Sequence, residues 1–269
     1  MYLDHFSLKE HPFNVTPDPR FLFFTARHQD AMDQLLYGIA ERKGFLVLTG
    51  EVGSGKTTLC RALLNRLPAG IRTALILNPN LSDTQLLRAI LQDLGAPPVG
   101  RDRLSLMGQL NDFLLAQMRR GDNVAVLLDE AQDLTPASLE QIRLLSNLET
   151  DQRKLLQIVL AGQPELDRRL GRPELRQLRQ RIMIRCTLQP LDAQEVGAYL
   201  EHRLRVAGAP ADVGFEEAAV RVIHGASKGI PRLVNKLSDR AMLAAYAAGR
   251  RVVFREDARR AHAELEALL

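Results

Sequence analysis

The sequence predicts an α/β fold with a parallel sheet of five strands, followed by a small all-α domain. Short apolar segments alternate with helix-like segments up to about residue 189, which is typical of βαβ units. A glycine-rich segment that ends in Gly-Lys-Thr stands between the first apolar segment and a helical one. From Pro190 onward only helical patterns follow. We therefore expect an N-terminal arm (1–27), an α/β domain (28–189) and a helical domain (190–269).

Composition excludes several classes of protein. The chain has 269 residues, 46% of them hydrophobic and 25% charged, which is typical of one large or two smaller globular domains. No apolar run reaches the ~18 residues of a membrane span, and Met1-Tyr2-Leu3-Asp4-His5 lacks the layout of a signal peptide. Two distant cysteines and six scattered histidines give neither a disulfide framework nor metal-ligand spacing. These features favour a reducing, cytoplasmic setting.

The pattern of apolar residues sets the order of the elements. The expected strands are 45–49, 73–78, 124–130, 155–162 and 182–188. The expected helices of the α/β domain are 28–43, one from 58, one capped by Ser82 or Asp83, 104–119, one from Thr135 or Pro136, and 165–180. The expected helices of the last domain are 193–207, 215–225, 230–248 and 255–268, the first with a capping box of Asp192 and Glu195.

The N-terminal arm combines three prolines and four phenylalanines between His11 and Phe24. Proline disfavours regular structure and the aromatic side chains favour burial, so we expect the arm to lie against the α/β domain. Two interpretations stay open: the arm walls an adenine pocket, or it only packs.

The glycine-rich segment fits the phosphate-binding pattern G-x-x-x-x-G-K-[ST]. It reads Gly50, Glu51, Val52, Gly53, Ser54, Gly55, Lys56 and Thr57, followed by Thr58. Glycines allow backbone angles that other residues rarely adopt, and the N–H groups of such a loop face an anion. Lys56 is then expected to reach the β- and γ-phosphates, and the Thr57 hydroxyl to ligate Mg²⁺. The expected cofactors are ATP and Mg²⁺.

A pair of carboxylates ends the third expected strand. Asp129 and Glu130 come directly after the apolar run that starts at Val124. Ligands of open α/β sheets bind at the carboxyl ends of the strands. We expect Asp129 to hold Mg²⁺ and Glu130 to activate the attacking water. Gln163, at the tip of the fourth strand, could sense the γ-phosphate.

The whole pattern resembles an AAA+ P-loop ATPase with a C-terminal helical lid, and is similar in particular to the ExeA/GspA-like family of secretion and pilus-assembly accessory ATPases. The motifs that carry the resemblance are Met1-Tyr2, Pro12-Phe13, Pro17-Asp18-Pro19, the phosphate loop, Leu77-Asn78-Pro79, Leu128-Asp129-Glu130-Ala131-Gln132, Leu160-Ala161-Gly162-Gln163-Pro164-Glu165-Leu166 and Gly229-Ile230-Pro231-Arg232.

The resemblance implies further roles. Asn78 would restrain the catalytic glutamate, Gln163 would stand at the sensor position, and Arg232 would be the lid arginine that contacts nucleotide. Arg181 would reach into a neighbouring subunit's site, with Arg176 and Arg179 as rivals. A trans arginine implies a homo-oligomer of the ring or hexamer type.

The function implied is Mg²⁺-dependent ATP hydrolysis that serves envelope secretion of the type II kind or pilus assembly. The expected place is the cytoplasm or the cytoplasmic face of the inner membrane, beside a membrane-associated partner. Longer family members continue into a membrane helix and a wall-binding domain, so this chain is either a stand-alone member or a fragment. The alternative is a DNA-binding AAA+ regulator of the transposition target-selection type, which a net charge of +4 permits without requiring.

Overall fold

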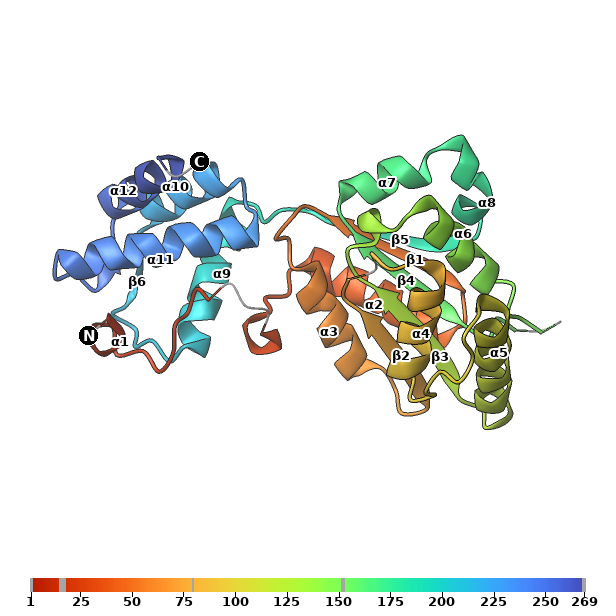
Figure 1. The fold of residues 1–269 in the computed structure, drawn as a ribbon. Coiled ribbons are helices and arrows are strands. Elements are labelled where there is room, and N and C mark those ends of the chain that lie inside the picture. The colour runs from red at the N-terminus through yellow and green to blue at the C-terminus, as the bar shows by residue number, and fades with distance from the viewer. Residues whose placement is uncertain (1, 15–17, 79, 151–152, 268–269) are drawn as a thin grey trace. The chain divides into compact units, whose positions relative to one another are not determined.

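The computed structural model describes residues 2–14, 18–78, 80–150 and 153–267, and the chain divides into two compact units (Figure 1). The first, called here the α/β unit, comprises Ala26–Gly50 and Leu59–Leu188. The second, the helical unit, comprises Met1–Thr25, Glu51–Thr58 and Gln189–Leu269.

Helices flank a central sheet in the α/β unit (Figure 1). Its elements in chain order are α2 (Ala26–Ala40), β1 (Phe45–Gly50), α3 (Lys56–Arg66), β2 (Ile71–Ile76), α4 (Asp83–Asp93), α5 (Arg103–Arg119), β3 (Asn123–Leu128), the 3₁₀ turn η2 (Ala131–Asp133), α6 (Pro136–Leu145), β4 (Gln157–Gly162), α7 (Pro164–Leu170), η3 (Pro173–Leu175), α8 (Arg176–Arg179) and β5 (Ile182–Leu188). The strands pair in the order β2-β3-β4-β1-β5, all parallel. The predicted five-stranded parallel sheet is thus confirmed.

Burial follows the strand order. The three central strands are buried along their whole length, whereas β2 and β5 at the edges are partly exposed. One apolar cluster joins strand residues to the inner faces of α4, α5, α6 and α7. Helix α2 approaches Leu46 and Ile184 so closely that a Cβ at Gly38 would lie 2.3 Å from the Leu46 side chain. Helices therefore cover the sheet through tight, residue-specific contacts.

The predicted helix caps agree with the structure. Ser82 caps α4 in a capping box with Gln85, and Thr135 caps α6 with a proline at its first position. Asp192 and Glu195 form the expected capping box at the start of α9. In each case the cap satisfies backbone N–H groups that the helix leaves without partners.

The predicted single helix over 165–180 is wrong. The structure has α7, then η3, then α8 in this stretch, with Gly171 ending α7 and Pro173 opening η3. Proline cannot donate the hydrogen bond that a continuous helix requires there, and it disfavours helical geometry in the residue before it. The second strand also differs, because it starts at Ile71 and ends at Ile76, two residues earlier than expected.

The helical unit contains a small parallel pairing that the sequence did not reveal. Its elements are α1 (Tyr2–His5), η1 (Pro19–Phe21), α9 (Ala193–Val206), β6 (Gly214–Phe215), α10 (Glu217–Ser227), α11 (Pro231–Ala247), β7 (Val252–Val253) and α12 (Arg255–Glu266). Strands β6 and β7 pair in parallel over two residues each. Strands this short leave no readable period in a sequence.

The described part of the N-terminal arm packs in the helical unit. Phe6, Phe13 and Phe21 belong to the same apolar cluster as the inner faces of α9 and α11. Buried Arg203 of α9 donates to the carbonyl oxygens of Pro12 (2.5 Å) and Asn14 (3.0 Å). The sequence led us to expect the arm against the α/β domain, but its described apolar side chains find their neighbours among the C-terminal helices. Pattern alone shows that an aromatic segment needs a partner without showing which one.

Within the described residues, the structure has no helix long and apolar enough to cross a membrane.

Candidate nucleotide site

The phosphate loop has the backbone geometry that its glycines predict. Gly53 has φ +82° and Gly55 has φ +97°, both in the left-handed region that glycine adopts without strain. The Ser54 N–H donates to the Glu51 carbonyl at 3.0 Å, which closes the turn. The loop follows β1 directly and runs into α3, whose first residue is Lys56. Strand, loop and helix therefore follow one another as the motif requires.

Two side chains of this loop fit an oxygen-rich anion. Lys56 is buried, and its Nζ donates to the Glu51 carbonyl at 2.9 Å. The Ser54 hydroxyl is buried without a hydrogen-bond partner among the described residues. A buried hydroxyl without a partner is costly in water-free surroundings. A phosphate oxygen in the loop would satisfy it, so the residues fit the nucleotide that the motif implies.

The predicted carboxylates lie at the same edge of the sheet as the start of the loop. In β1, Thr49 pairs with Gly162 of β4, and Leu128 of β3 pairs with Leu160 of the same strand. The carboxyl ends of β3, β4 and β1 therefore lie side by side. Asp129 and Glu130, Gln163 and the phosphate loop each follow one of these three ends, as expected for a nucleotide site of a parallel sheet.

Glu130 is held by two side-chain amides. Its Oε2 accepts from Gln132 Nε2 at 2.8 Å and from Gln163 Nε2 at 3.3 Å. The structure thus brings Glu130 and Gln163 together. The structure also shows a contact for Gln132, a residue to which the sequence analysis assigned no role although it lies in one of the motifs. Its position two residues after Glu130 in a 3₁₀ turn was the only signal, and this spacing alone does not reveal the contact.

The acidic groups suit magnesium better than a metal with an all-protein cage. Among the residues the structure describes, no group of three or more His, Cys, Asp or Glu side chains could hold a metal ion. Mg²⁺ typically takes one or two protein ligands and completes its shell with phosphate oxygens and water. Buried Asp129 and the Thr57 hydroxyl are the side chains that would hold it.

Arg232 lies next to the phosphate loop within the helical unit. Its N–H donates to the Gly53 carbonyl at 3.2 Å, at the start of α11. A Cβ at Gly53 would lie 2.5 Å from Arg232 Cβ, so a glycine is needed at this contact. This arrangement agrees with a nucleotide-contacting role for Arg232, which stays a prediction.

Asn78 lies just beyond the end of β2. Its side-chain oxygen accepts the N–H of Asn80 at 3.2 Å, and the residue is exposed. The amide contacts to Glu130 described above come instead from Gln132 and Gln163. Restraint of Glu130 by Asn78 stays a prediction.

The three candidate trans arginines differ in their contacts. Arg181 donates to the Ser146 hydroxyl and, at 2.6 Å, to Asn147 Oδ1, and is half-buried beside the end of α6. Arg179 is exposed and donates to the Gly171 carbonyl at 3.0 Å. Arg176 is exposed at the start of α8. Arg181 is therefore engaged within its own chain, whereas Arg176 and Arg179 are both exposed.

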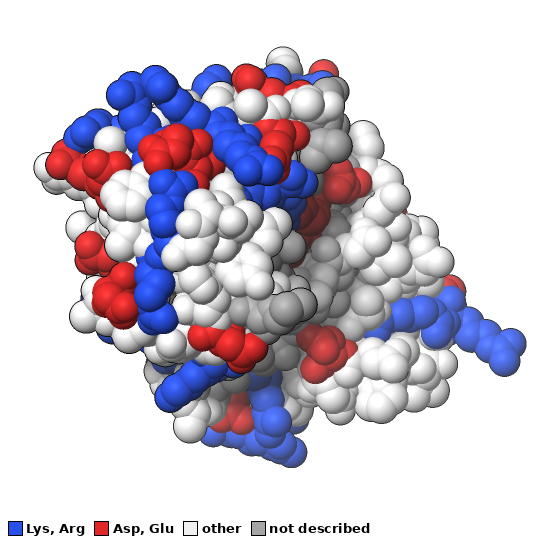
Figure 2. Space-filling view, turned by 90° about the vertical axis from the view of Figure 1, so that its left-hand side faces the viewer, with Lys and Arg blue, Asp and Glu red and all other residues white. Residues whose placement is uncertain are grey.

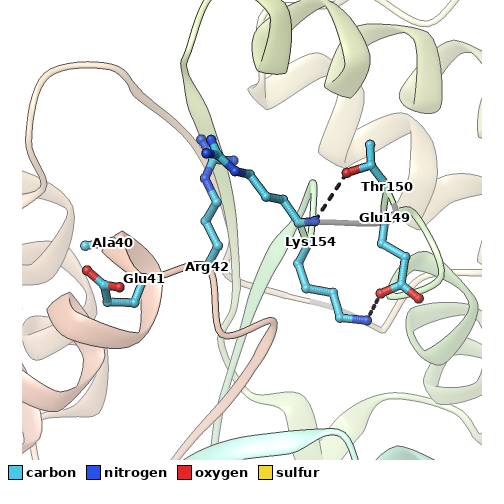
Figure 3. Close-up of a pocket in the computed structure, with 7 residues that line it drawn as sticks. Ala40, Glu41, Arg42, Glu149, Thr150 and Lys154 are labelled. Carbon is cyan, nitrogen blue, oxygen red and sulfur yellow. Dashed lines mark hydrogen bonds and ion pairs between the residues drawn. The ribbon is translucent and has the colours of Figure 1, made fainter.

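A polar hollow of about 780 Å³ lies elsewhere on the α/β unit (Figure 3). Its lining residues are Ala40, Glu41, Arg42, Glu149, Thr150, Arg153 and Lys154. They precede β1 and β4, so the hollow lies at the amino-terminal edge of the sheet, opposite the strand ends that Asp129 and Gln163 follow. Burial lowers the pKa of the Arg42 guanidinium, and the positive charge of Arg153 lowers it further by a smaller amount. Because ligands of parallel sheets bind at the carboxyl edge, we give this hollow no part in nucleotide binding.

Comparison with known proteins agrees with this geometry. Residues 39–170 match the family described as AAA domain. The ORC2 protein of Aeropyrum pernix has a similar structure, with a TM-score of 0.70 and 20% identity over 95% of this chain and 72% of that one. Cdc6p of Pyrobaculum aerophilum is similar as well, with a TM-score of 0.67 and 20% identity over 93% of this chain and 69% of that one. The chain therefore has the fold of an AAA+ P-loop NTPase.

The chain is more similar in sequence to a curated relative than to these two structures. Over 250 residues the chain is 48% identical to General secretion pathway protein A of Aeromonas hydrophila, a match that covers 93% of this chain and 46% of that protein. The resemblance to the ExeA/GspA-like family therefore extends over nearly the whole chain, which spans about half the length of this relative.

Proposed function

We propose that the chain is a Mg²⁺-dependent ATPase that assembles in a nucleotide-dependent way and drives or regulates the assembly of an envelope secretion or pilus system. The observation that carries the proposal is the arrangement at the carboxyl edge of the sheet. There the phosphate loop, the Asp129-Glu130 pair and Gln163 follow three neighbouring strands. Nucleotide binding alone requires no general base, so Glu130 favours hydrolysis over passive binding.

The chain's own residues divide the work. The backbone of the phosphate loop and Lys56 bind and neutralise the phosphates, while Thr57 and Asp129 hold Mg²⁺, which supplies further charge stabilisation when bound. Glu130 orients the attacking water and accepts its proton. Gln163 senses the γ-phosphate, and Arg232 contacts the nucleotide from the helical unit.

Oligomerisation completes the site in this proposal. An arginine from the adjacent subunit stabilises the transition-state charge, and such groups contribute on the order of 10³–10⁵ in rate in well-studied phosphoryl transfer. The accessibility of Arg176 and Arg179 supports either of them over Arg181 for this role.

The partner and place follow from the relative's name. Similarity to a general secretion pathway protein supports a partner in secretion. By the family resemblance, this partner is a membrane-associated secretion or pilus protein at the cytoplasmic face of the inner membrane. The net charge of +4 is compatible with an acidic membrane surface.

Steady-state ATP hydrolysis tests the activity. We expect Lys56→Ala and Glu130→Gln each to lower kcat by at least about 100-fold, the first with weakened nucleotide binding and the second with binding retained. Unchanged hydrolysis in Lys56→Ala would overturn the proposal.

The alternative, a DNA-binding regulator, has less support. On the face shown in Figure 2, Lys and Arg side chains are interspersed with Asp and Glu side chains. Phosphate contacts make DNA-stimulated activity fall steeply with salt. A hydrolysis rate that duplex DNA does not change, at low and at moderate salt, is expected; strong stimulation that fades with salt would favour the alternative.

A further inference from the structure

The side-chain amide of Gln132 joins the carboxylate of Glu130 to the end of β4. Its Nε2 donates to Glu130 Oε2 at 2.8 Å, and its Oε1 accepts the backbone N–H of Gln163 at 2.9 Å. The reverse orientation would turn an oxygen toward a carboxylate and an N–H toward an N–H, so the neighbours fix which end points where. Nε2 also contacts Asp133 Oδ2 at 3.2 Å.

The backbone of Glu130 makes this contact important. Glu130 has φ +50°, in the left-handed region that residues other than glycine rarely adopt. Strained backbone of this kind is found at sites where a side chain must be presented in a particular direction. The Glu130 N–H donates to Asp129 Oδ1 at 3.0 Å, which holds the main chain. The direction of the carboxylate is then set by the amides that contact it.

The segment that carries Gln132 is also tied to α7. Arg169 of α7 donates to the carbonyl oxygens of Gln132 and of Leu134, the latter at 2.5 Å. At the end of β4, a Cβ on Gly162 would lie 3.0 Å from Gln132 Oε1, so the amide approaches the strand as closely as a glycine allows. A shift of the junction between β4 and α7 therefore moves Gln132, and with it the group that holds Glu130.

We propose that Gln132 is a positioning residue for hydrolysis. It holds Oε2 of Glu130 so that Oε1 is left to accept the proton of the attacking water, and it makes the position of this carboxylate depend on that of Gln163. Gln132 itself exchanges no proton and acts through Glu130. This inference rests on the proposed function, in which Glu130 is the general base. In this inference Gln132 restrains Glu130, a role that the family resemblance assigns to Asn78.

Two substitutions at Gln132 separate positioning from a purely structural role. Gln132→Met removes both polar ends of the side chain at similar size. Gln132→Glu keeps an oxygen that accepts the Gln163 N–H but turns a second carboxylate toward Glu130. Asp133→Asn serves as the matched control. Asp133 is exposed, and its bond to Glu130 runs from the backbone N–H to the Glu130 carbonyl oxygen at 2.9 Å, which this substitution keeps.

We expect Gln132→Met to lower kcat by roughly 10- to 100-fold, because a misplaced catalytic group costs about that much. Gln132→Glu is expected to lower it at least as far, because two carboxylates repel each other. KM and the Kd of a fluorescent ATP analogue should stay within about threefold of wild type, as should kcat of Asp133→Asn. A kcat close to wild type in Gln132→Glu would overturn the inference, since a structural role needs only the retained acceptor.

The thermal stability of the chain without nucleotide provides a second test of the contact between Gln132 and Glu130. Gln132→Glu is expected to lower the thermal midpoint of the free chain at pH 8, and the double variant Gln132→Glu with Glu130→Gln to restore it, because the amide and the acid have exchanged places. A double variant no more stable than Gln132→Glu would contradict the contact. If Gln132→Met does not fold, this pair still decides the question.

Glu130→Gln assayed in parallel separates the two proposals. If Glu130→Gln hydrolyses ATP at the wild-type rate, the proposed function fails at its general base. If Glu130→Gln is inactive and both Gln132 variants keep the wild-type kcat, only the positioning role fails.

Discussion

Gly229 has a constrained backbone in the turn that precedes Arg232. It has φ +74°, and a Cβ there would lie 1.8 Å from the Leu191 carbonyl oxygen. The Leu191 N–H in turn donates to the Gly229 carbonyl oxygen at 2.9 Å, so the two segments contact each other through their main chains. Neither backbone can move aside without breaking this hydrogen bond.

We therefore expect Gly229→Ala to destabilise the helical unit by at least about 2 kcal/mol, from left-handed strain of roughly 1–2 kcal/mol and the main-chain clash together. Urea unfolding followed by circular dichroism measures this. Gly225→Ala is the matched control: Gly225 lies in α10 with open space around its added Cβ, and alanine there should stabilise by about 0.5–1 kcal/mol. Equal midpoints for the two variants would contradict the close approach.

Individual site residues differ in how far sequence reveals them. Gly53, Gly55 and Lys56 could be predicted because the motif specifies the local backbone, and the structure has that backbone. Gln132 could not, because its importance lies in contacts with Glu130 and Gln163, and the second of these comes from another strand. A spacing of two residues in sequence carries no information about which way an amide points.

At the scale of elements, Arg203 of α9 fastens the N-terminal arm to the helical unit. Its guanidinium donates to the arm at two carbonyls, donates to the Tyr199 hydroxyl at 2.8 Å, and lies 4.7 Å from the centre of the Phe21 ring. The residue is 6% exposed, so little water can replace these contacts when the guanidinium is removed.

Arg203→Met keeps the apolar stem and removes every donated bond. We expect a loss of roughly 3 kcal/mol in the stability of the helical unit and faster tryptic cleavage after Lys9 and Arg20 of the arm. Arg205→Met, at an exposed position of the same helix, should change neither. Protease resistance equal to wild type in Arg203→Met would show that apolar packing alone holds the arm.

Strand β5 and helix α2 together bury Cys186. Burial, with a smaller effect of the Asp30 charge, raises the pKa of this thiol to about 11. Its Sγ lies 3.6 Å from Gln34 Oε1 on α2. Only about one thiol in a thousand is then ionised at pH 8.

We expect Cys186, followed in a Cys60→Ala variant, to react with iodoacetamide far more slowly than a free thiol at pH 8. The rate should rise about tenfold per pH unit up to pH 10, because the thiolate is the reactive form. The same variant unfolded in guanidinium chloride should react at the rate of an ordinary cysteine. Native labelling as fast as unfolded labelling would show that α2 does not cover β5.

Elements with a strong apolar pattern were predictable, and weakly patterned ones were not. The expected strand 182–188 agrees with β5 residue for residue, because turn residues bound its apolar run. The expected helix 165–180 failed because its arginines and leucines suggest a continuous helix, while Gly171 and Pro173 break it. Local breakers outweigh a helical stripe when they fall in its middle.

At the scale of the whole molecule, the proposed trans arginine makes activity a property of an assembly. Hydrolysis per subunit should then rise with protein concentration until the oligomer is fully formed. Arg176→Ala is expected to lower kcat by on the order of 10³-fold with nucleotide binding retained. Arg181→Ala should act mainly on stability, because Arg181 bonds to Ser146 and Asn147 of its own chain.

Mixing two inactive variants tests whether the arginine acts in trans. In an equal mixture of Glu130→Gln and Arg176→Ala chains, some sites combine an intact Glu130 with a neighbour's intact Arg176. Random assembly into a closed ring places this combination at about a quarter of the sites. We therefore expect the mixture to recover about a quarter of the wild-type rate. A mixture as inactive as its parts would rule out Arg176 as the trans group, and the same experiment with Arg179→Ala would then test its rival. Recovery with Arg181→Ala instead would mean that its bonds to the end of α6 break on assembly, since one guanidinium cannot serve both places.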